Sequence, residues 1–156
     1  MAEKDIKFMK LAIKEAKKAG QKAEVPVGAV LVAESGDILS LSHNQVIILA
    51  DPTAHAEMLA LREAAAKVLN YRLLNSTLYV TIEPCVMCMG AIVHARVARV
   101  IFGAKDLKWG AGGSLYNFAE DRRLNHRPEI IHGICEVECR ELLQEFFRSK
   151  RTSSAE

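Results

Sequence analysis

Two short segments of the sequence contain residues that can bind a metal ion and transfer protons. One is His-Ala-Glu at residues 55–57, and the other is Pro-Cys-Val-Met-Cys at residues 84–88. Cysteines three residues apart lie on one face of a helix, so Cys85 and Cys88 can bind the same ion as thiolates. His55 would be the third ligand, and this set of nitrogen and sulfur donors indicates zinc.

The number of protein ligands indicates what such an ion would do. One histidine and two cysteines leave one position of a tetrahedral zinc ion for water, which is typical of a catalytic site rather than a structural one. Zinc lowers the pKa of that water towards neutrality. Glu57 is then available to accept and pass on the proton, because it is not spent as a ligand.

Both segments lie where the sequence predicts the start of a helix. Side chains two residues apart on a helix point about 200° apart, so His55 and Glu57 can share a site only beyond the helix end. There the free backbone N–H groups and the positive end of the dipole favour a thiolate over a thiol. Each segment alone also fits a helix cap or a structural metal motif, but together they match the H-x-E…P-C-x-x-C pattern of zinc-dependent nucleobase deaminases.

The elements that must position these segments alternate along the chain. Apolar periodicity and turn residues predict helices and strands with these bounds: helix 5–19, a hairpin of strands 27–33 and 38–43, a helix from near 55 to 69, strand 77–82, helix 84–95, strand 97–102, a weaker strand 129–134 and helix 136–150. Asp5 is a candidate cap for the first helix. The alternation predicts an α/β layered sheet in one domain over residues 1–151, with residues 152–156 as a disordered tail.

The composition fits one soluble domain. Half of the 156 residues are hydrophobic and 26% are charged, and the net charge of +2 is too small to indicate nucleic-acid binding by itself. No apolar run approaches the ~20 residues of a membrane span, and the first residues do not form a secretory signal. We therefore predict a cytoplasmic protein without membrane association, in which the four cysteines are not paired as disulfides.

Some residues of the second half could bind RNA or simply face solvent. Its basic residues predict either a phosphate-binding face or a solvated surface: Lys105, Lys108, Arg122, Arg123, Arg127, Arg148, Lys150 and Arg151. Cys135 and Cys139 are predicted to be small buried residues rather than ligands, because Cys139 shares a helix face with apolar side chains. If the zinc has a fourth protein ligand, His94 is the best candidate among the other histidines.

Seven segments carry a more specific resemblance: Glu-Val-Pro-Val-Gly-Ala at 24–29, Pro-Thr-Ala-His-Ala-Glu at 52–57, Leu-Tyr-Val-Thr at 78–81, Glu-Pro-Cys-Val-Met-Cys at 83–88, Gly-Ala-Lys-Asp at 103–106, Asn-His-Arg at 125–127 and Phe-Phe-Arg at 146–148. In these segments the sequence resembles the tRNA-specific adenosine deaminases of the cytidine-deaminase-like superfamily, over nearly the whole chain. The resemblance implies a three-layer αβα fold with a five-stranded mixed sheet, and a homodimer.

The resemblance also implies the reaction. Adenosine at the wobble position of a tRNA anticodon stem-loop would become inosine. A hydroxide bound to Zn²⁺ would attack the C6 atom of adenine, and Glu57 would shuttle the proton. The ligands would be His55, Cys85 and Cys88. A single-stranded anticodon loop suits this chemistry, because the adenosine must leave its stack to enter the pocket.

Four further residues match positions that bind the substrate in this family. Asn44 would hydrogen-bond the target base, with turning the loop after a strand as the alternative role. Asp106 and Asn125 would contact the RNA, and Phe147 would stack on a base or pack in the core. The sequence departs from the family at Trp109, where a small or polar residue is usual, and this indole could stack on a base or cover the core.

Two other functions are compatible with the same residues. The zinc chemistry does not identify the ring that is attacked, so the substrate could be a free base or nucleoside such as cytosine, cytidine or guanine. The protein could also be a non-catalytic RNA-binding module that zinc stabilises through His55, Cys85, Cys88 and a fourth ligand. Replacement of Glu57 by Gln separates these alternatives, because only an enzyme needs the proton shuttle.

Overall fold

The computed structural model describes residues 2–155, and side chains as far as residue 152. Within these residues, four helices and five strands follow one another: α1 (Glu3–Gln21), β1 (Gly28–Val32), β2 (Ile38–His43), α2 (Ala56–Val68), β3 (Thr77–Ile82), α3 (Val86–His94), β4 (Arg99–Ala104), β5 (Glu129–His132) and α4 (Glu136–Ala155). Among the described residues, no helix is both long and apolar enough to span a membrane.

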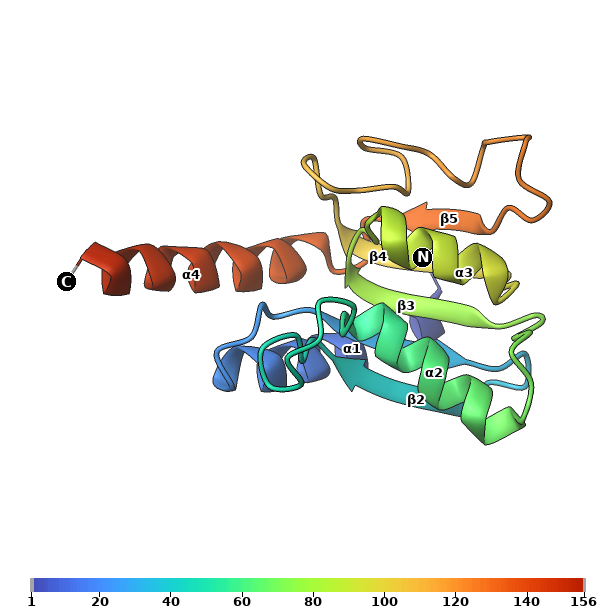
Figure 1. Cartoon of the computed structure of the whole chain (residues 1–156), viewed down its shortest axis with the longest axis horizontal. Helices are drawn as coiled ribbons and strands as arrows, with labels where there is room; N and C mark the ends of the chain where they lie inside the picture. The colour runs from blue at the N-terminus through green and yellow to red at the C-terminus, as the bar shows by residue number, and fades with distance from the viewer. Residues whose placement is uncertain (1, 156) are drawn as a thin grey trace.

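The five strands form one mixed sheet in the order β2-β1-β3-β4-β5. β1 is antiparallel to β2 and to β3, whereas β3, β4 and β5 are parallel to one another. The helices α2 and α3 lie side by side on one face of this sheet, and α1 lies on the opposite face (Figure 1). The structure therefore confirms the predicted three-layer αβα fold.

Apolar side chains on both faces of the central strands hold the layers together. In β3, Leu78 and Val80 point towards the α2 and α3 layer, whereas Tyr79 between them packs against α1 and α4. All three are at most 2% exposed, as expected for a strand that is covered on both faces. On the opposite face, Phe8 of α1 packs against Tyr79 with the two rings tilted by 39° and their centroids 5.2 Å apart.

The strand directions bring three loops to one edge of the sheet. Since β2 and β3 are both antiparallel to β1, and β4 is parallel to β3, the carboxyl ends of β2, β3 and β4 lie at the same edge. The chain leaves that edge through residues 44–55, 83–85 and 105–118. Open α/β sheets bind their ligands beyond the carboxyl ends of strands, so this edge is where a site is expected.

Some element bounds differ from the predicted ones. β4 ends at Ala104 rather than at 102, because Gly103 lets Cys139 pack directly on the strand and Ala104 still pairs with Ile82. α4 continues to Ala155, five residues beyond the predicted end, and projects away from the sheet (Figure 1). The division into a domain over 1–151 and a tail over 152–156 stays a prediction, and Glu156 lies outside the described residues.

Asp5 does not have its predicted role as a helix cap. The helix α1 begins at Glu3, so Asp5 lies in its first turn. Its carboxylate is buried and accepts a hydrogen bond of 2.6 Å from the hydroxyl of Tyr79. This contact joins α1 to the centre of the sheet, because a buried phenol needs a partner for its hydroxyl.

Candidate metal and catalytic site

The three predicted metal ligands meet at the carboxyl edge of the sheet. His55 is the residue before α2, and Cys85 is the residue before α3, with Cys88 in the first turn of that helix. The His55 Nδ1 atom lies 3.7 Å from the Cys85 Sγ atom and 3.5 Å from the Cys88 Sγ atom. The three donor atoms lie within 4.8 Å of one another.

This triangle fits a zinc ion. Zn–S bonds of about 2.3 Å and Zn–N bonds of about 2.1 Å at a tetrahedral angle place nitrogen and sulfur about 3.6 Å apart. The two observed separations, 3.7 and 3.5 Å, agree with that value. Because His55 faces both sulfurs with Nδ1, this ring nitrogen is the one that can bind the metal.

The electrostatics of the site already favour a thiolate. The pKa of the Cys85 thiol is lowered to about 4, first because Cys88 donates a hydrogen bond to its sulfur and, against the effect of burial, because His55 donates another. The hydrogen bond to Cys85 in turn raises the pKa of His55. The pKa of the Cys88 thiol is raised, because it donates to Cys85 and is buried. Metal binding to this set therefore releases protons.

Glu57 lies beside the ligands without joining them. It is in the first turn of α2 and only 3% exposed. Burial raises the pKa of Glu57 to about 7. A carboxyl group with such a pKa both accepts and donates a proton near neutrality, which is what a proton shuttle must do.

Asn44 connects the loop after β2 to the start of α2. Its side-chain Oδ1 atom accepts a hydrogen bond of 2.7 Å from the backbone N–H of Ala56, the residue between His55 and Glu57. Ala56 is fully buried, so this N–H has no other partner in solvent. One of the two acceptor lone pairs of the Asn44 carbonyl oxygen is thus occupied, and among the described residues no hydrogen bond from its NH₂ group is found.

Two buried glutamates that the sequence reasoning missed hold the loops on either side of the ligands. Glu24 is 1% exposed and accepts the backbone N–H groups of Ile47 and Ile48 at 2.9–3.1 Å. It thereby fixes the loop that carries Asn44. Buried charges need such partners, so a carboxylate in an otherwise apolar stretch was the signal that could have revealed it.

Glu83 has the same role in the loop after β4. It is 2% exposed and accepts the backbone N–H groups of Asp106, Gly112 and Ser114 at 2.9–3.1 Å, together with the hydroxyl of Ser114. Gly110 passes so close that a Cβ atom there would overlap the Glu83 carboxylate. The hydrogen bonds to this one carboxylate thus hold the loop in its conformation.

His43, the last residue of β2, is joined to Glu15 of α1 just before the loop that carries Asn44. The His43 Nδ1 atom lies 3.1 Å from a carboxylate oxygen of Glu15, and its Nε2 atom lies 3.3 Å from the ammonium group of Lys22. These partners assign the proton to Nδ1, since the ammonium group can only donate. Lys18 completes the chain of charges with a bond of 2.6 Å to Glu15.

Comparison with known proteins assigns this site to a family. Residues 2–104 match the family described as the cytidine and deoxycytidylate deaminase zinc-binding region. The chain is 49% identical over 150 residues to the tRNA-specific adenosine deaminase of Haemophilus influenzae, covering 96% of this chain and 87% of that protein. The chain belongs to the tRNA-specific adenosine deaminase family.

Two further members of the family show the same relationship. The tRNA-specific adenosine deaminase of Bacillus subtilis is 49% identical over 144 residues, covering 92% of this chain and 89% of that protein. A solved structure from a study of A-to-I editing by tRNA:A34 deaminases at the wobble position superposes with a TM-score of 0.85 and 43% identity. It covers 88% of this chain and 99% of the solved chain.

Asp106 lies in the loop that is attached to the segment of Cys85 through Gly110. Asp106 follows β4 and lies in the loop that Glu83 holds. Its Oδ1 atom accepts the backbone N–H groups of Lys108 and Trp109, both at 3.1 Å. Asp106 thus shapes the loop, and its contact with RNA stays a prediction.

Asn125 and His94 lie at the other end of α3. Asn125 accepts a hydrogen bond of 2.9 Å from Arg96, which follows the carboxyl end of this helix, whereas Cys85 precedes its start. Nine residues of helix span roughly 14 Å, so Asn125 is far from the ligands of its own chain. His94 is the last residue of α3 and is exposed, so it cannot be a fourth ligand of this metal.

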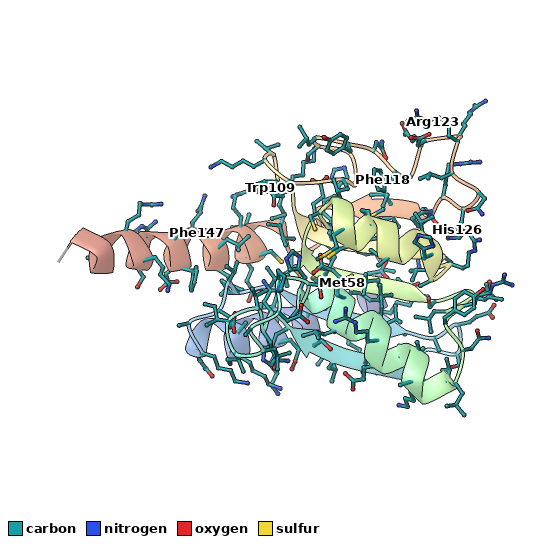
Figure 2. The ribbon with its side chains drawn as sticks, viewed as in Figure 1. Met58, Trp109, Phe118, Arg123, His126 and Phe147 are labelled. Carbon is teal, nitrogen blue, oxygen red and sulfur yellow. The ribbon has the colours of Figure 1, made fainter. Side chains whose placement is uncertain are left out.

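Phe147 lies on α4, away from the sheet (Figure 2). Its ring packs edge-on against Phe146 and is 45% exposed, so it is not a core residue. It lines a groove of about 480 Å³ with three arginines of α4 and a lysine that follows β4: Arg140, Arg148, Arg151 and Lys105. The predicted burial is confirmed for Cys139, which is 1% exposed in the core beside α1, but it is wrong for Cys135, which is only half-buried because it precedes α4.

Proposed function

We propose that this protein hydrolytically deaminates adenosine to inosine at the wobble position of a tRNA anticodon. The observation that carries the proposal is the triangle of His55, Cys85 and Cys88 with the buried carboxyl group of Glu57 beside it. Three ligands leave a tetrahedral metal ion one position for water, as a catalytic site requires. The family relationship supports adenosine in tRNA as the substrate.

The residues divide the chemistry among them. His55, Cys85 and Cys88 would hold zinc, which when bound makes water acidic enough to react at neutral pH. Glu57 would accept one proton of the attacking water at its carboxylate and deliver it to the ring nitrogen, where it stays. It would then carry the second proton of that water to the departing amine, which leaves as ammonia. Asn44 would donate from its amide NH₂ group to the adenine ring, since its oxygen is bonded to Ala56.

The predicted partners follow from the substrate. A single-stranded anticodon loop can offer an unstacked adenosine, and the basic residues near α4 would neutralise its phosphates. The roles of Asp106, Asn125 and Phe147 in binding the RNA belong to this proposal. Because Asn125 is remote from the ligands of its own chain, its role requires the proposed homodimer or an RNA that reaches around α3.

The test uses zinc-loaded protein and a synthetic anticodon stem-loop with adenosine at the wobble position. We expect inosine and an equal amount of ammonia from the unchanged protein. Glu57→Gln should keep one equivalent of zinc and lose activity by at least about 100-fold, the low end of what a positioned acid–base group contributes. Glu63→Gln, an exposed change on the same helix, is the matched control and should leave the rate unchanged.

The alternatives give different results in the same experiment. A deaminase of free bases would bind zinc and release ammonia from guanine or cytosine but not from the stem-loop. A non-catalytic module would bind zinc and RNA, and Glu57→Gln would change neither. Absence of inosine from the zinc-loaded, unchanged protein would refute the proposed function.

A further inference from the structure

The loop after β4 exposes an unusual amount of apolar surface next to the ligands. We define residues 105–116 as the stacking loop. Four large apolar side chains within these twelve residues are at least half exposed: Leu107 at 78%, Trp109 at 68%, Leu115 at 52% and Tyr116 at 53%. Exposed apolar surface gathered in one place is typical of a binding surface.

The backbone of the stacking loop is nevertheless firmly held. Glu83 accepts three of its N–H groups and one hydroxyl. The N–H of Ala111 donates to the carbonyl of Pro84 at 2.8 Å, and Gly110 pairs with Cys85 in an isolated antiparallel bridge. The loop is therefore attached directly to the segment that supplies two metal ligands, and its exposed side chains start from a fixed backbone.

Trp109 has a defined place relative to the ligands. It directly precedes Gly110, the partner of Cys85, and its own N–H is bonded to Asp106. One Cα step of 3.8 Å and one antiparallel pair of about 5 Å place the Cα atom of Trp109 within about 9 Å of that of Cys85. Trp109 is thus beside the metal site, at a distance suited to a neighbour of the reacting group, and Figure 2 shows it on the loop above the start of α4.

The charges around Trp109 favour an anionic partner. Lys105 and Lys108 are both exposed on the same loop. The Asp106 carboxylate between them is occupied by two backbone N–H groups. An exposed indole flanked by lysines is the arrangement by which proteins bind a single-stranded nucleic acid, with aromatic stacking on the base and cations on the phosphates.

We propose that Trp109 is a stacking platform for the unpaired nucleotide next to the target adenosine. This inference rests on the proposed function, because it requires an RNA loop at the site. The indole would raise affinity for the RNA without touching the reacting base. Glu83 would act as a positioning residue, since it fixes the loop from which the indole projects.

The chain offers a direct readout, because Trp109 is its only tryptophan. Its emission can be followed in zinc-loaded Glu57→Gln protein, which is expected to bind the stem-loop without turnover. We expect the stem-loop to quench this emission in a saturable way. An abasic site beside the target adenosine, on one of its two sides, should remove the quenching while fluorescence anisotropy of a labelled RNA still reports binding.

Kinetics on otherwise unchanged protein give an independent test. Trp109→Ala should raise KM for the stem-loop at least about fivefold with kcat within twofold, which corresponds to about 1 kcal/mol of stacking. Trp109→Phe should retain most of the affinity. Tyr71→Ala is the matched control, because Tyr71 is 65% exposed and lies beyond the opposite end of α2.

The results separate this inference from the proposed function. A saturating stem-loop that leaves the emission of Trp109 unchanged would overturn the stacking platform, even if inosine is formed. A KM within twofold of the unchanged protein for Trp109→Ala would do so as well. Dissociation of a dimer by Trp109→Ala in sedimentation would assign the indole to contact with a second copy instead. Failure of the unchanged protein to form inosine refutes only the proposed function.

Discussion

The replacement of Glu83 by Gln tests how much of the site depends on one buried carboxylate. The change keeps the shape of the side chain but exchanges one acceptor oxygen for an NH₂ group. One carboxylate oxygen accepts from Gly112 and Ser114, and the other accepts from Asp106 and the Ser114 hydroxyl. The amide oxygen can retain only one of these pairs.

The better arrangement leaves one part-buried donor, the N–H of Asp106, without a partner. With the amide oxygen towards Gly112 and the Ser114 backbone, the new NH₂ group can donate to the Ser114 hydroxyl but must face the N–H of Asp106. An unsatisfied buried N–H costs about 1–3 kcal/mol, and loss of the charge weakens the bonds that remain by about 1 kcal/mol. We therefore expect Glu83→Gln to lower the free energy of unfolding by about 2–4 kcal/mol.

Urea and thermal unfolding measure this loss. In a chain of this size, about 2–4 kcal/mol corresponds to a fall in Tm of about 4–16 °C. Hydrogen exchange should show the fastest new exchange at the N–H group of Asp106, which loses its acceptor. The control is Glu129→Gln, since Glu129 is exposed and only 3.5 Å from Arg99 in a surface ion pair, which is worth less than about 0.5 kcal/mol. Equal stability of the two variants would refute the reasoning.

Two further changes test the supports of the site. Although burial raises it, hydrogen bonds from Lys18 and His43 lower the pKa of Glu15 below 4.5. The ionised Glu15 carboxylate therefore stabilises the folded protein above pH 4.5, and this stabilisation is lost as the pH falls further. Glu15→Gln should lower the free energy of unfolding in urea by about 1–3 kcal/mol at pH 7 and by less at pH 3. A difference independent of pH would contradict this. Gly103→Ala should lower the free energy of unfolding by about 1–3 kcal/mol, because the new Cβ atom would overlap Cys139. The loss should be smaller when Cys139 is also replaced by Ala. If the effects of the two substitutions simply add, the contact between these residues is refuted.

The metal ligands could be predicted from the sequence because the chemistry restricts them. His55, Cys85 and Cys88 belong to two short segments, each at the start of a helix, and only a few residue types bind zinc. The place of Glu57 at the start of α2 could be predicted for a similar reason, whereas its role as a proton shuttle stays a prediction. The pattern of apolar residues likewise predicted the strands and an α/β layered sheet, whereas the three-layer αβα fold was implied by the family resemblance.

The supports of the site could not be predicted, because they depend on partners far along the chain. Glu83 bonds to groups 23–31 residues away, and Glu24 bonds to groups 23 and 24 residues away. The sequence shows the carboxylate but not which backbone N–H groups will face it. The same reason explains why the sequence did not show that the Asn44 oxygen accepts a hydrogen bond from Ala56.

The sequence by itself predicted the chemistry, because the types and the local spacing of His55, Glu57, Cys85 and Cys88 are those expected of a zinc site with an open position and a proton shuttle. Only the tertiary structure decided what surrounds that chemistry. Because β2, β3 and β4 run in the same direction, the loops that follow them lie at one edge of the sheet. Asn125 lies at the opposite end of α3 and is therefore far from that edge. Local spacing is fixed by covalent geometry, whereas the pairing of distant groups is fixed only when the chain packs.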